Sequence, residues 1–374
     1  MVAKIAFGTT LLDKGLNDSG IDGIGQYCQE LLGEYQRQCN DLTISPFSFG
    51  VNTSPSHATL LPSYSGYLTK SLLNLPINDF SRNYFEGADL IHATDQLIPI
   101  VRNKPLVATV MDAIPLSHPQ YIKARSRIIK PYLWKKLTQR ANHIITISEF
   151  SKNEISYFME YRPELISSIP LGVDDRYFER LPNSQRQKVL EQFDISRPFF
   201  FFVGSIQPRK NLLRTLQAHA SLPNSLPQEF PIIIAGKLAW DDGLTLQAIH
   251  KGIEEKRCIW LRYISEEQKR GLLQECLGMI FASLYEGFGL PILEAFASNT
   301  PVITSNCTSM PEVAGKAGIY VDPYDQDSIR DALLSLIEDK YNLPQLKADG
   351  LTRAKLFSWS KAAAKTIDIY KSLI

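Results

Sequence analysis

The sequence predicts an α/β protein with two domains, each built on a parallel sheet, and three observations support that fold class. The 374 residues are too many for one ordinary core and suit about two domains. Short apolar runs alternate with longer stretches of helical spacing, which is typical of βαβ units whose strands are buried on both faces. The alternation restarts once, after a polar segment at Leu171–Arg197 that contains Pro182, so we interpret this segment as a linker.

Each domain is expected to contribute its own series of strands. In the first domain the apolar runs are Lys4–Thr9, Leu90–Ala93, Leu106–Met111, His143–Ile147 and Ser168–Pro170. In the second domain they are Phe199–Gly204, Pro231–Ala235, Ile259–Tyr263, Gly278–Ala282, Pro301–Thr304 and Gly318–Val321. Helices are expected between the strands, and the clearest helical spacing is at Ile24–Gln38, Ile128–Arg140 and Ser265–Cys276.

Composition excludes several classes of protein. With 44% hydrophobic and 21% charged residues the chain is expected to fold, and its formal net charge of +1 argues against a nucleic-acid binder that works through bulk charge. Five cysteines form no C-x-x-C pair, which suits a reducing compartment and gives no metal signature. The opening "MVAKIAFGTT" predicts a strand rather than a signal peptide, and no apolar run of about 18 residues is present, so we expect a cytoplasmic protein.

The first candidate motif is "GIDGIGQYCQEL", Gly20 to Leu31, which opens a helix after the first strand. Ligands of open parallel sheets bind at the carboxyl ends of strands, so motifs that follow strands matter most. Glycines at positions 20, 23 and 25 let an anion approach the backbone at a helix N-terminus. The pattern is not G-x-G-x-x-G, and a plain tight turn explains it equally well.

The second candidate motif is "FVGSIQPRKNL", Phe202 to Leu212, where a strand ends at Gly204. Arg209 and Lys210 follow at the entry to a helix. Two adjacent cations at a strand exit suit a diphosphate, which the forked guanidinium can grip with two hydrogen bonds. A solvated basic turn is the alternative interpretation.

The third candidate motif is "YEGFGLPILEAF", Tyr285 to Phe296, which carries Glu286 and Glu294 in an apolar run. Pro291 suits a first helical turn, so the N–H groups near position 289 form an anion site. Glu294 is expected in that first turn and Glu286 in the loop before it. Since a carboxylate repels phosphate, we expect each acid to bind hydroxyl groups. The alternative is a helix N-terminus whose acids add about 0.3–1 kcal/mol of stability.

Taken together, these motifs resemble those of the family 4 retaining glycosyltransferases, which have the GT-B fold of two Rossmann-like domains facing across a cleft. "EGFGLPILEA" matches the E-x-x-x-x-x-x-x-E motif of that family. Further landmarks follow in the same order: "ITISEFSKNEI", "IPLGVDDRYF", "FVGSIQPRKNL", "MPEVAGKAGIYVDPYD" and "FSWSKAAAKTIDIY". The resemblance implies an acceptor-side domain at residues 1–175, a nucleotide-sugar domain at 176–356, and a helix at 357–374 that crosses back to the first domain.

The resemblance also implies a role for each matching residue. Glu286 would bind hydroxyls of the donor sugar, and Glu294 those of the ribose. Arg209 and Lys210 would neutralise the leaving diphosphate. The remaining implied contacts are backbone amides of Phe288, Gly289 and Leu290 near the diphosphate, Gly204 at the strand exit, Gly23 and Gly25 from the other domain, and Tyr263 and Ile264 beside the base. The family needs no metal, and no cofactor is expected.

One position departs from the family pattern. Many relatives carry His-Asp at the end of a first-domain strand, whereas "VATVMDAIPLSHPQY" has Met111 followed by Asp112. Methionine cannot donate a hydrogen bond or transfer a proton. Either Asp112 supplies the polar contact to the sugar or acceptor, or activity depends less on this position. His92 and His118 are nearby in sequence, although a structural or surface role fits each of them better.

A basic and aromatic segment, "YIKARSRIIKPYLWKKLTQRA", spans Tyr121 to Ala141 without an acid. Such a surface can dock on anionic lipid, and relatives often use membrane-bound acceptors. A solvated helix with a core-facing stripe explains the segment equally well. We therefore expect peripheral contact with the inner face of the cytoplasmic membrane only as one of two interpretations.

The predicted function is transfer of a sugar from a nucleoside diphosphate sugar to a glycan or lipid-linked acceptor, as in polysaccharide or O-antigen assembly. The motifs look most like those of mannosyltransferases, so GDP-mannose is the first expected donor and a UDP-sugar the second. No carboxylate nucleophile is evident, which favours front-face attack with the leaving phosphate taking the acceptor proton. A GT-B nucleotide-sugar 2-epimerase and an inactive nucleotide-sugar-binding scaffold are the alternatives.

Overall fold

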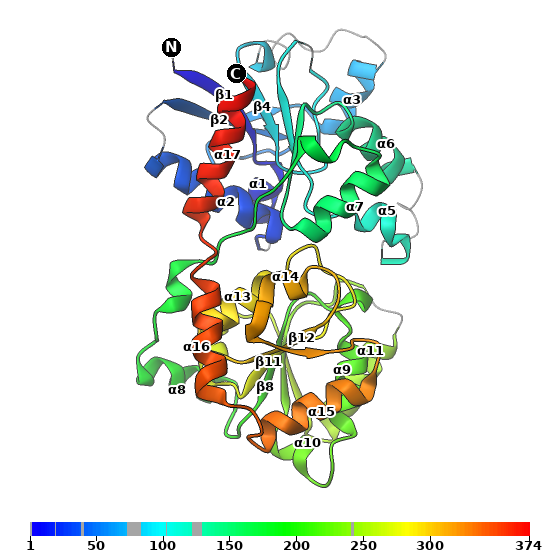
Figure 1. The fold of residues 1–374 in the computed structure, drawn as a ribbon, viewed down its shortest axis with the longest axis vertical. Coiled ribbons are helices and arrows are strands. Elements are labelled where there is room, and N and C mark those ends of the chain that lie inside the picture. The colour runs from blue at the N-terminus through cyan, green and yellow to red at the C-terminus, as the bar shows by residue number, and fades with distance from the viewer. Residues whose placement is uncertain are drawn as a thin grey trace. The chain divides into compact units, whose positions relative to one another are not determined.

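The computed structural model describes residues 2–18, 20–38, 41–72, 84–101, 103–121, 129–240 and 243–374. The chain divides into two compact units (Figure 1). The first unit combines Met1–Gly172 with Trp359–Ile374, and the second is Val173–Ser358.

The first unit is built on a parallel sheet of order β3-β2-β1-β4-β5-β6-β7. Its strands are β1 (Ala3–Gly8), β2 (Leu42–Phe49), β3 (Thr59–Leu61), β4 (Leu90–Ala93), β5 (Leu106–Thr109), β6 (His143–Thr146) and β7 (Ile166–Ser168). After β1 the chain adds β2 and β3 on one side, and it then returns to add β4 to β7 on the other. The carboxyl ends of β1 and β4 therefore form the point where the strand order reverses, which is where open α/β sheets bind ligands.

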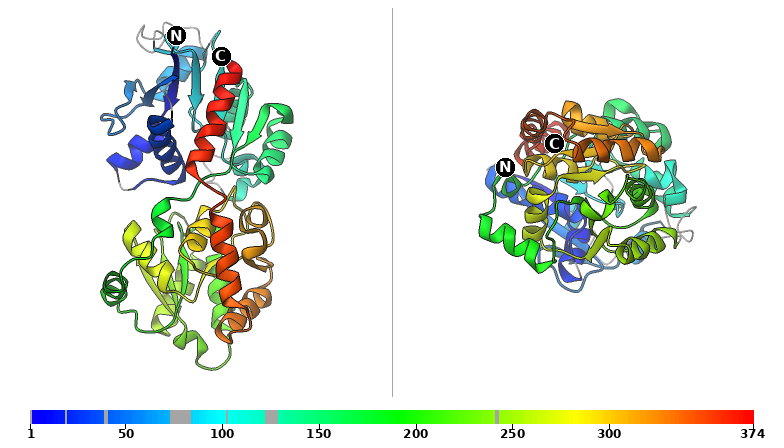
Figure 2. Two further views of the ribbon diagram at one scale, coloured as in Figure 1. Left: turned by 60° about the vertical axis from the view of Figure 1, so that its left-hand side comes forward. Right: turned by 90° about the horizontal axis from the view of Figure 1, so that it is seen from below.

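Helices cover this sheet, and one of them comes from the end of the chain. They are α1 (Thr10–Asn17), α2 (Gly23–Gln38), α3 (Tyr64–Leu72), α5 (Ile114–Ser117), α6 (Ile129–Thr138), α7 (Glu149–Met159) and α17 (Trp359–Leu373). Helix α17 lies beside α2, with the hydroxyl groups of Tyr35 and Tyr370 3.1 Å apart (Figures 1 and 2). Residues Trp359–Ile374, which include α17, group with the first unit.

Most strands of the first unit lie where the sequence predicts them, with two differences. The sequence analysis did not predict β2 and β3, and β2 contains Pro46, which is unusual in a central strand. The structure accommodates it because β3 pairs only with Phe47–Phe49, so one side of β2 is open at Pro46. The strand expected at Ser168–Pro170 is β7 at Ile166–Ser168, because Pro170 cannot donate to a ladder.

The second unit contains a parallel sheet of order β10-β9-β8-β11-β12-β13. Its strands are β8 (Phe200–Val203), β9 (Ile232–Ala235), β10 (Cys258–Arg262), β11 (Gly278–Phe281), β12 (Val302–Ser305) and β13 (Gly318–Val321), close to the expected positions. Its helices are α8 (Asn183–Gln192), α9 (Leu212–Ala220), α10 (Leu226–Glu229), α11 (Leu244–Glu254), α12 (Glu266–Glu275), α13 (Leu290–Ala297), α14 (Met310–Ala314), α15 (Gln326–Ile337) and α16 (Leu343–Ala354). Strand order reverses here between β8 and β11, so the loops after these strands meet.

The interpretation of Leu171–Arg197 as a linker was wrong for most of its length. From Val173 onward the segment belongs to the second unit and contains α8. The helix packs on α12, where buried Arg186 pairs with Glu275 and also bonds the carbonyl of Leu181. The polar composition predicted an exposed linker, whereas Arg186 is buried because it is paired with Glu275.

No helix among the described residues is long and apolar enough to span a bilayer.

Candidate active site

Arg209, Lys210 and Glu286 form a buried charged cluster at the carboxyl edge of the second sheet. The two cations lie in the short 3-10 turn Pro208–Lys210 after β8, and Glu286 follows β11, the neighbouring strand. Nη1 of Arg209 lies 2.6 Å from Oε2 of Glu286, and Nζ of Lys210 lies 2.6 Å from Oε1. Arg209 also donates to the carbonyl oxygen of Tyr285 at 3.0 Å.

Electrostatics keep this cluster charged. Burial alone would raise the pKa of Glu286, but the positive charges of Arg209 and Lys210 lower it to about 2. Burial lowers the pKa of Lys210, and the adjacent carboxylate opposes that effect. With all three groups ionised the cluster carries one net positive charge, so it attracts an anion. The sequence predicted hydroxyl partners for Glu286, whereas its partners in the structure are two cations.

Hydrogen bonds fix the loop from Glu286 to Leu290 and so hold the first residues of α13 next to the charged cluster. Oγ of Ser309 donates to the carbonyl oxygens of Glu286 and Phe288, each at 2.8 Å. Gly289 precedes the helix with φ of +107°, a conformation that favours glycine, and Leu290 is the first helical residue. Phe288 is buried against Phe357, which anchors the loop.

Gly204 directly follows β8 with φ of +144° and lets the chain pass close to Lys210. A Cβ at position 204 would lie 3.6 Å from Cε of Lys210. The carbonyl oxygen of Gly204 in turn lies 1.9 Å from where a Cβ of Gly236 would be, so that position cannot carry a side chain. Gly236 was not singled out from the sequence, and its place directly after β9 was the available signal.

Glu294 lies one turn into α13 rather than in its first turn as expected, because the helix begins at Leu290. It is 3% exposed, and its Oε1 lies 3.0 Å from Nζ of Lys269. Burial raises the pKa of Glu294, which Lys269 opposes without overcoming it. The same ammonium lies 3.3 Å from Glu266 and over the ring of Tyr177 at 5.2 Å.

Lys269 and Tyr177 were missed by the sequence analysis. Lys269 is on α12, and Tyr177 donates to Oε2 of Glu266 at 2.6 Å. Burial lowers the pKa of Lys269, but its two carboxylate partners raise it above the ordinary value. The available signal was the position of α12 directly after Tyr263 and Ile264, since helices that follow sheet-edge loops often support the site.

Tyr263 and Ile264 follow β10, at the edge of the same sheet. Tyr263 is 66% exposed, and Nζ of Lys237 lies 5.2 Å from its ring centroid. Beside them is a hollow of about 460 Å³. The hollow is lined by Lys237, Leu238, Leu246, His250, Trp260 and Arg262. It is one of the concave surfaces next to the carboxyl ends of β9 and β10.

The first unit carries the other predicted positions. Gly23 begins α2 and is exposed, and the amide of Gly25 donates to Oδ1 of Asp22 at 2.8 Å. A Cβ at Gly25 would lie 2.6 Å from Cγ2 of Ile21, so this glycine is needed for the turn itself. Asp112 is half-buried, and its Oδ1 accepts from the amide of Ile114 at 3.1 Å.

Comparison with known proteins assigns the chain to a family. The model "Glycosyltransferase Family 4" matches residues 21–177, and "Glycosyl transferases group 1" matches 184–350. The chain is 34% identical over 269 residues to O-antigen chain mannosyltransferase B of Escherichia coli, covering 71% of this chain and 70% of that protein. The chain belongs to glycosyltransferase family 4.

This family 4 enzyme is also 26% identical over 299 residues to the serotype-specific mannosyltransferase WbdA of Escherichia coli. That match covers 78% of this chain but 36% of WbdA, so the chain spans about a third of WbdA's length. Among solved structures, Anabaena HepE in complex with UDP and glucose has a TM-score of 0.77 at 17% identity, covering 99% of this chain and all of that one. The family 4 enzyme therefore has the GT-B fold.

His92 does not replace the histidine that many relatives carry at the position of Met111. His92 is fully buried, with Nδ1 2.5 Å from the hydroxyl of Tyr370 and Nε2 2.7 Å from Oγ1 of Thr109. His118 stacks on Tyr121 with 5.6 Å between the ring centroids. His92 is thus structural in this family 4 enzyme, as the sequence analysis favoured.

Proposed function

We propose that this family 4 enzyme transfers mannose from a nucleoside diphosphate mannose to a glycan or lipid-linked glycan, with retention of anomeric configuration. The observation that carries the proposal is the buried cluster of Arg209, Lys210 and Glu286 at the carboxyl edge of the second sheet. A cluster with net positive charge beside a helix N-terminus suits a diphosphate, the leaving group of a sugar nucleotide. The mannosyl specificity is taken from relatives named as O-antigen mannosyltransferases.

Arg209 and Lys210 are assigned to the diphosphate as it leaves. Their charged ends are fixed by Glu286 before any donor binds, so little reorganisation is needed when negative charge develops. The first amides of α13, at Gly289 and Leu290, have no acceptor within the helix and add to the same anion site. This arrangement supplies charge stabilisation from the protein alone.

The two acids are assigned to two sets of hydroxyl groups. Glu286 stays ionised down to about pH 2 and is therefore a strong acceptor for hydroxyls of the transferred sugar. Glu294, one turn further along α13, is assigned to the ribose. Lys269 neutralises Glu294, which keeps a second negative charge from opposing the diphosphate.

The nucleobase is assigned to the edge of the sheet at Tyr263 and Ile264. The hollow of about 460 Å³ beside these residues is large enough for a base and is lined by the aromatic ring of Trp260 and the aliphatic part of Leu238. A guanine base is the first expectation because the relatives are mannosyltransferases, and a uracil base is the second because HepE was solved with UDP.

The reaction proposed is front-face attack. The bond from the anomeric carbon to the leaving phosphate oxygen breaks while the acceptor oxygen attacks from the same face, and the phosphate oxygen takes the acceptor proton. Glu286 is a poor nucleophile, since both of its oxygens are paired with cations. A polar contact of Asp112 with the sugar or acceptor, and an anion contact of Gly23 and Gly25, stay predictions.

The proposal is tested by a thermal-shift screen followed by transfer assays. GDP-mannose, UDP-glucose, GDP and UDP are compared, and a ligand that binds only the folded state raises the melting temperature. We expect GDP-mannose to give the largest shift and to yield a mannosylated product with a mannose glycoside as acceptor. The proposal is wrong if no sugar nucleotide shifts the melting temperature, or if the donor sugar is epimerised without acceptor.

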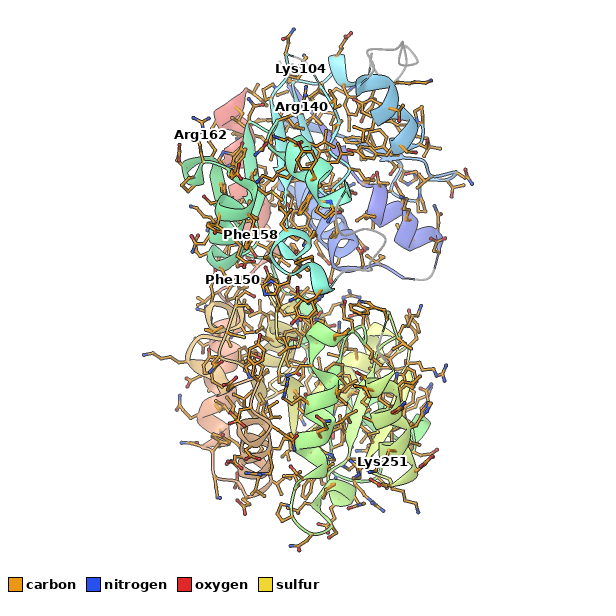
Figure 3. The ribbon with its side chains drawn as sticks, turned by 90° about the vertical axis from the view of Figure 1, so that its right-hand side faces the viewer. Lys104, Arg140, Phe150, Phe158, Arg162 and Lys251 are labelled. Carbon is orange, nitrogen blue, oxygen red and sulfur yellow. The ribbon has the colours of Figure 1, made fainter. Side chains whose placement is uncertain are left out.

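Contact with an anionic membrane is proposed for α6. Tyr132 is 62% exposed and Lys136 follows it one turn later and is exposed, while Trp134 is buried on the core side. Arg140, also exposed, lies just past the end of the helix. Figure 3 shows Arg140, Lys104 and Arg162 at the end of the first unit away from Phe150. Other cations of the predicted segment, Lys123, Arg125 and Arg127, lie outside the described residues. Flotation with vesicles containing anionic lipid would test it, with Lys136→Glu expected to reduce binding.

A further inference from the structure

We propose that Asn211 is a positioning residue that holds Arg209 and Lys210 in place for the donor's diphosphate. The inference rests on the proposed transfer from a nucleoside diphosphate sugar, and it concerns a residue that none of the assigned donor contacts includes. Asn211 directly follows the two cations and is 5% exposed, so it acts through them and not on the substrate itself.

The backbone of Asn211 ends the turn Pro208–Lys210, here called the cation turn, and begins the next helix. Its φ of +59° and ψ of +27° lie in the left-handed region, where asparagine is favoured among residues with a side chain. Its amide donates to the carbonyl oxygen of Pro208 at 3.0 Å, and its own carbonyl oxygen accepts from the amide of Thr215 at 3.1 Å. Glycine would fit this conformation as well, so asparagine at position 211 points to a task for the side chain.

The side chain of Asn211 joins the segments that follow β8, β11 and β13 at the carboxyl edge of the second sheet. Nδ2 donates to the carbonyl oxygen of Ala282 at 2.9 Å and to that of Pro323 at 2.7 Å. Nη1 of Arg214 donates to Oδ1 of Asn211 at 2.8 Å and to the same oxygen of Pro323 at 3.1 Å. A carboxylate or a hydroxyl group does not supply two donors and an acceptor together, so this place requires an amide.

These contacts fix the cation turn against the loop that carries Glu286. The carbonyl oxygen of Arg209 accepts from the amide of Leu284 at 2.7 Å. The cation turn is therefore attached to the loop after β11 on both sides of Lys210, by the backbone of Arg209 and by the side chain of Asn211. Without the amide of Asn211 one of these attachments is lost, and the two charged ends can move. Charges stabilise a leaving group best when they are in place before the reaction, so such movement lowers turnover.

The experiment measures kcat with saturating donor in Asn211→Gly, which suits the left-handed backbone and removes the amide. We expect kcat to fall at least about tenfold at a temperature where circular dichroism shows the variant to be folded, since small misplacements are costly in an active site. Asn211→Asp is the second variant and should lose at least as much, because a carboxylate cannot donate to the carbonyl oxygen of Ala282. Asn224→Gly is the matched control. Asn224 is exposed, also has a positive φ of +55°, and should keep the wild-type kcat when changed.

A double-mutant cycle separates positioning from plain stabilisation of the fold. In the Arg209→Ala background, Asn211→Gly should lower kcat by no more than about threefold, because a residue that acts through Arg209 has less left to lose there. A merely structural residue would lower kcat by the same factor in both backgrounds.

The outcomes separate failure of this inference from failure of the proposed function. Wild-type kcat in both Asn211 variants, or equal losses with and without Arg209, would overturn the positioning role. Loss of the fold in both variants would overturn it as well, since Asn211 would then be structural. Absence of transfer by the wild-type enzyme from any sugar nucleotide would overturn the proposed function instead, before any variant is compared.

Discussion

Arg209 donates through a single nitrogen to both Glu286, at 2.6 Å, and the carbonyl oxygen of Tyr285, at 3.0 Å. The guanidinium is therefore held from two directions by the loop after β11. This fixes a positive charge at the sheet edge although the side chain comes from the turn after β8. The relationship underlies the first three predictions.

Arg209→Ala and Lys210→Ala should each lower turnover by at least about tenfold, because one charged contact to a leaving diphosphate is worth roughly 1.5–3 kcal/mol. Initial rates with saturating donor measure this. Lys251→Ala is the control, since that lysine is on the exposed side of α11. Near-normal rates in both site variants would show that the diphosphate does not bind at this edge of the second sheet.

Transfer should persist in excess EDTA. Two fixed cations and a helix N-terminus are available to stabilise the leaving diphosphate, so an added divalent ion is not needed. The rate is measured with and without chelator, and then with Mg²⁺ or Mn²⁺ restored. Loss of transfer on chelation that either ion reverses would contradict the proposed mechanism.

Glu286→Gln should impair transfer far more than it impairs binding of the free nucleoside diphosphate, whereas Glu294→Gln should weaken both. The free diphosphate has a ribose but no transferable sugar, so only the second change removes one of its contacts, at a cost of about ten- to hundredfold in affinity. Removing the charge of Glu286 also leaves the charges of Arg209 and Lys210 unbalanced, which favours binding of the anionic diphosphate. Calorimetry with GDP, UDP and ADP measures the affinities and identifies the base. Equal weakening in the two variants would reject this division of roles.

His92 should make the folded protein less stable as the pH falls. Burial lowers its pKa from 6.5 to about 3, so between these values only the unfolded state takes the proton. The contribution of neutral, buried His92 to the free energy of unfolding is complete above about pH 6.5 and is lost as the pH falls toward 3. The difference in unfolding free energy between wild type and His92→Gln should shrink by roughly 2 kcal/mol from pH 7.5 to 5, because the slope is about 1.4 kcal/mol per pH unit. A difference that does not change with pH would show that the pKa of His92 is the same in the folded and the unfolded protein, so that burial does not lower it.

Sequence reasoning located most strands of both sheets because their apolar runs are buried on both faces and bounded by turns. Strand β2 was not predicted, and its Pro46 is tolerated because β3 pairs with β2 only from Phe47 onward, which the local sequence pattern does not encode. The charged cluster was anticipated as separate motifs, yet the direct pairing of Glu286 with Arg209 was not. That pairing depends on β8 and β11 being neighbours, and strand order is not encoded in local spacing.

Lys269 illustrates the same limit. Lys269 sits in an ordinary amphipathic helix, and only its distance of 3.0 Å from Glu294 gives it significance. Residues whose importance comes from topology are found in a structure, while glycine and charge motifs are found in a sequence.

The contact of Tyr370 with His92 and Tyr35 joins the last helix to β4 and α2, which are made early in the chain. During synthesis the ribosome releases residues 1–172 long before Tyr370 leaves the exit tunnel. Until then His92 and α2 lack their partner, whereas residues 173–358 have their whole sheet available earlier. Domains generally fold in order from the N-terminus as they emerge. Here the half of the protein that is translated first is the last to acquire its complete set of contacts.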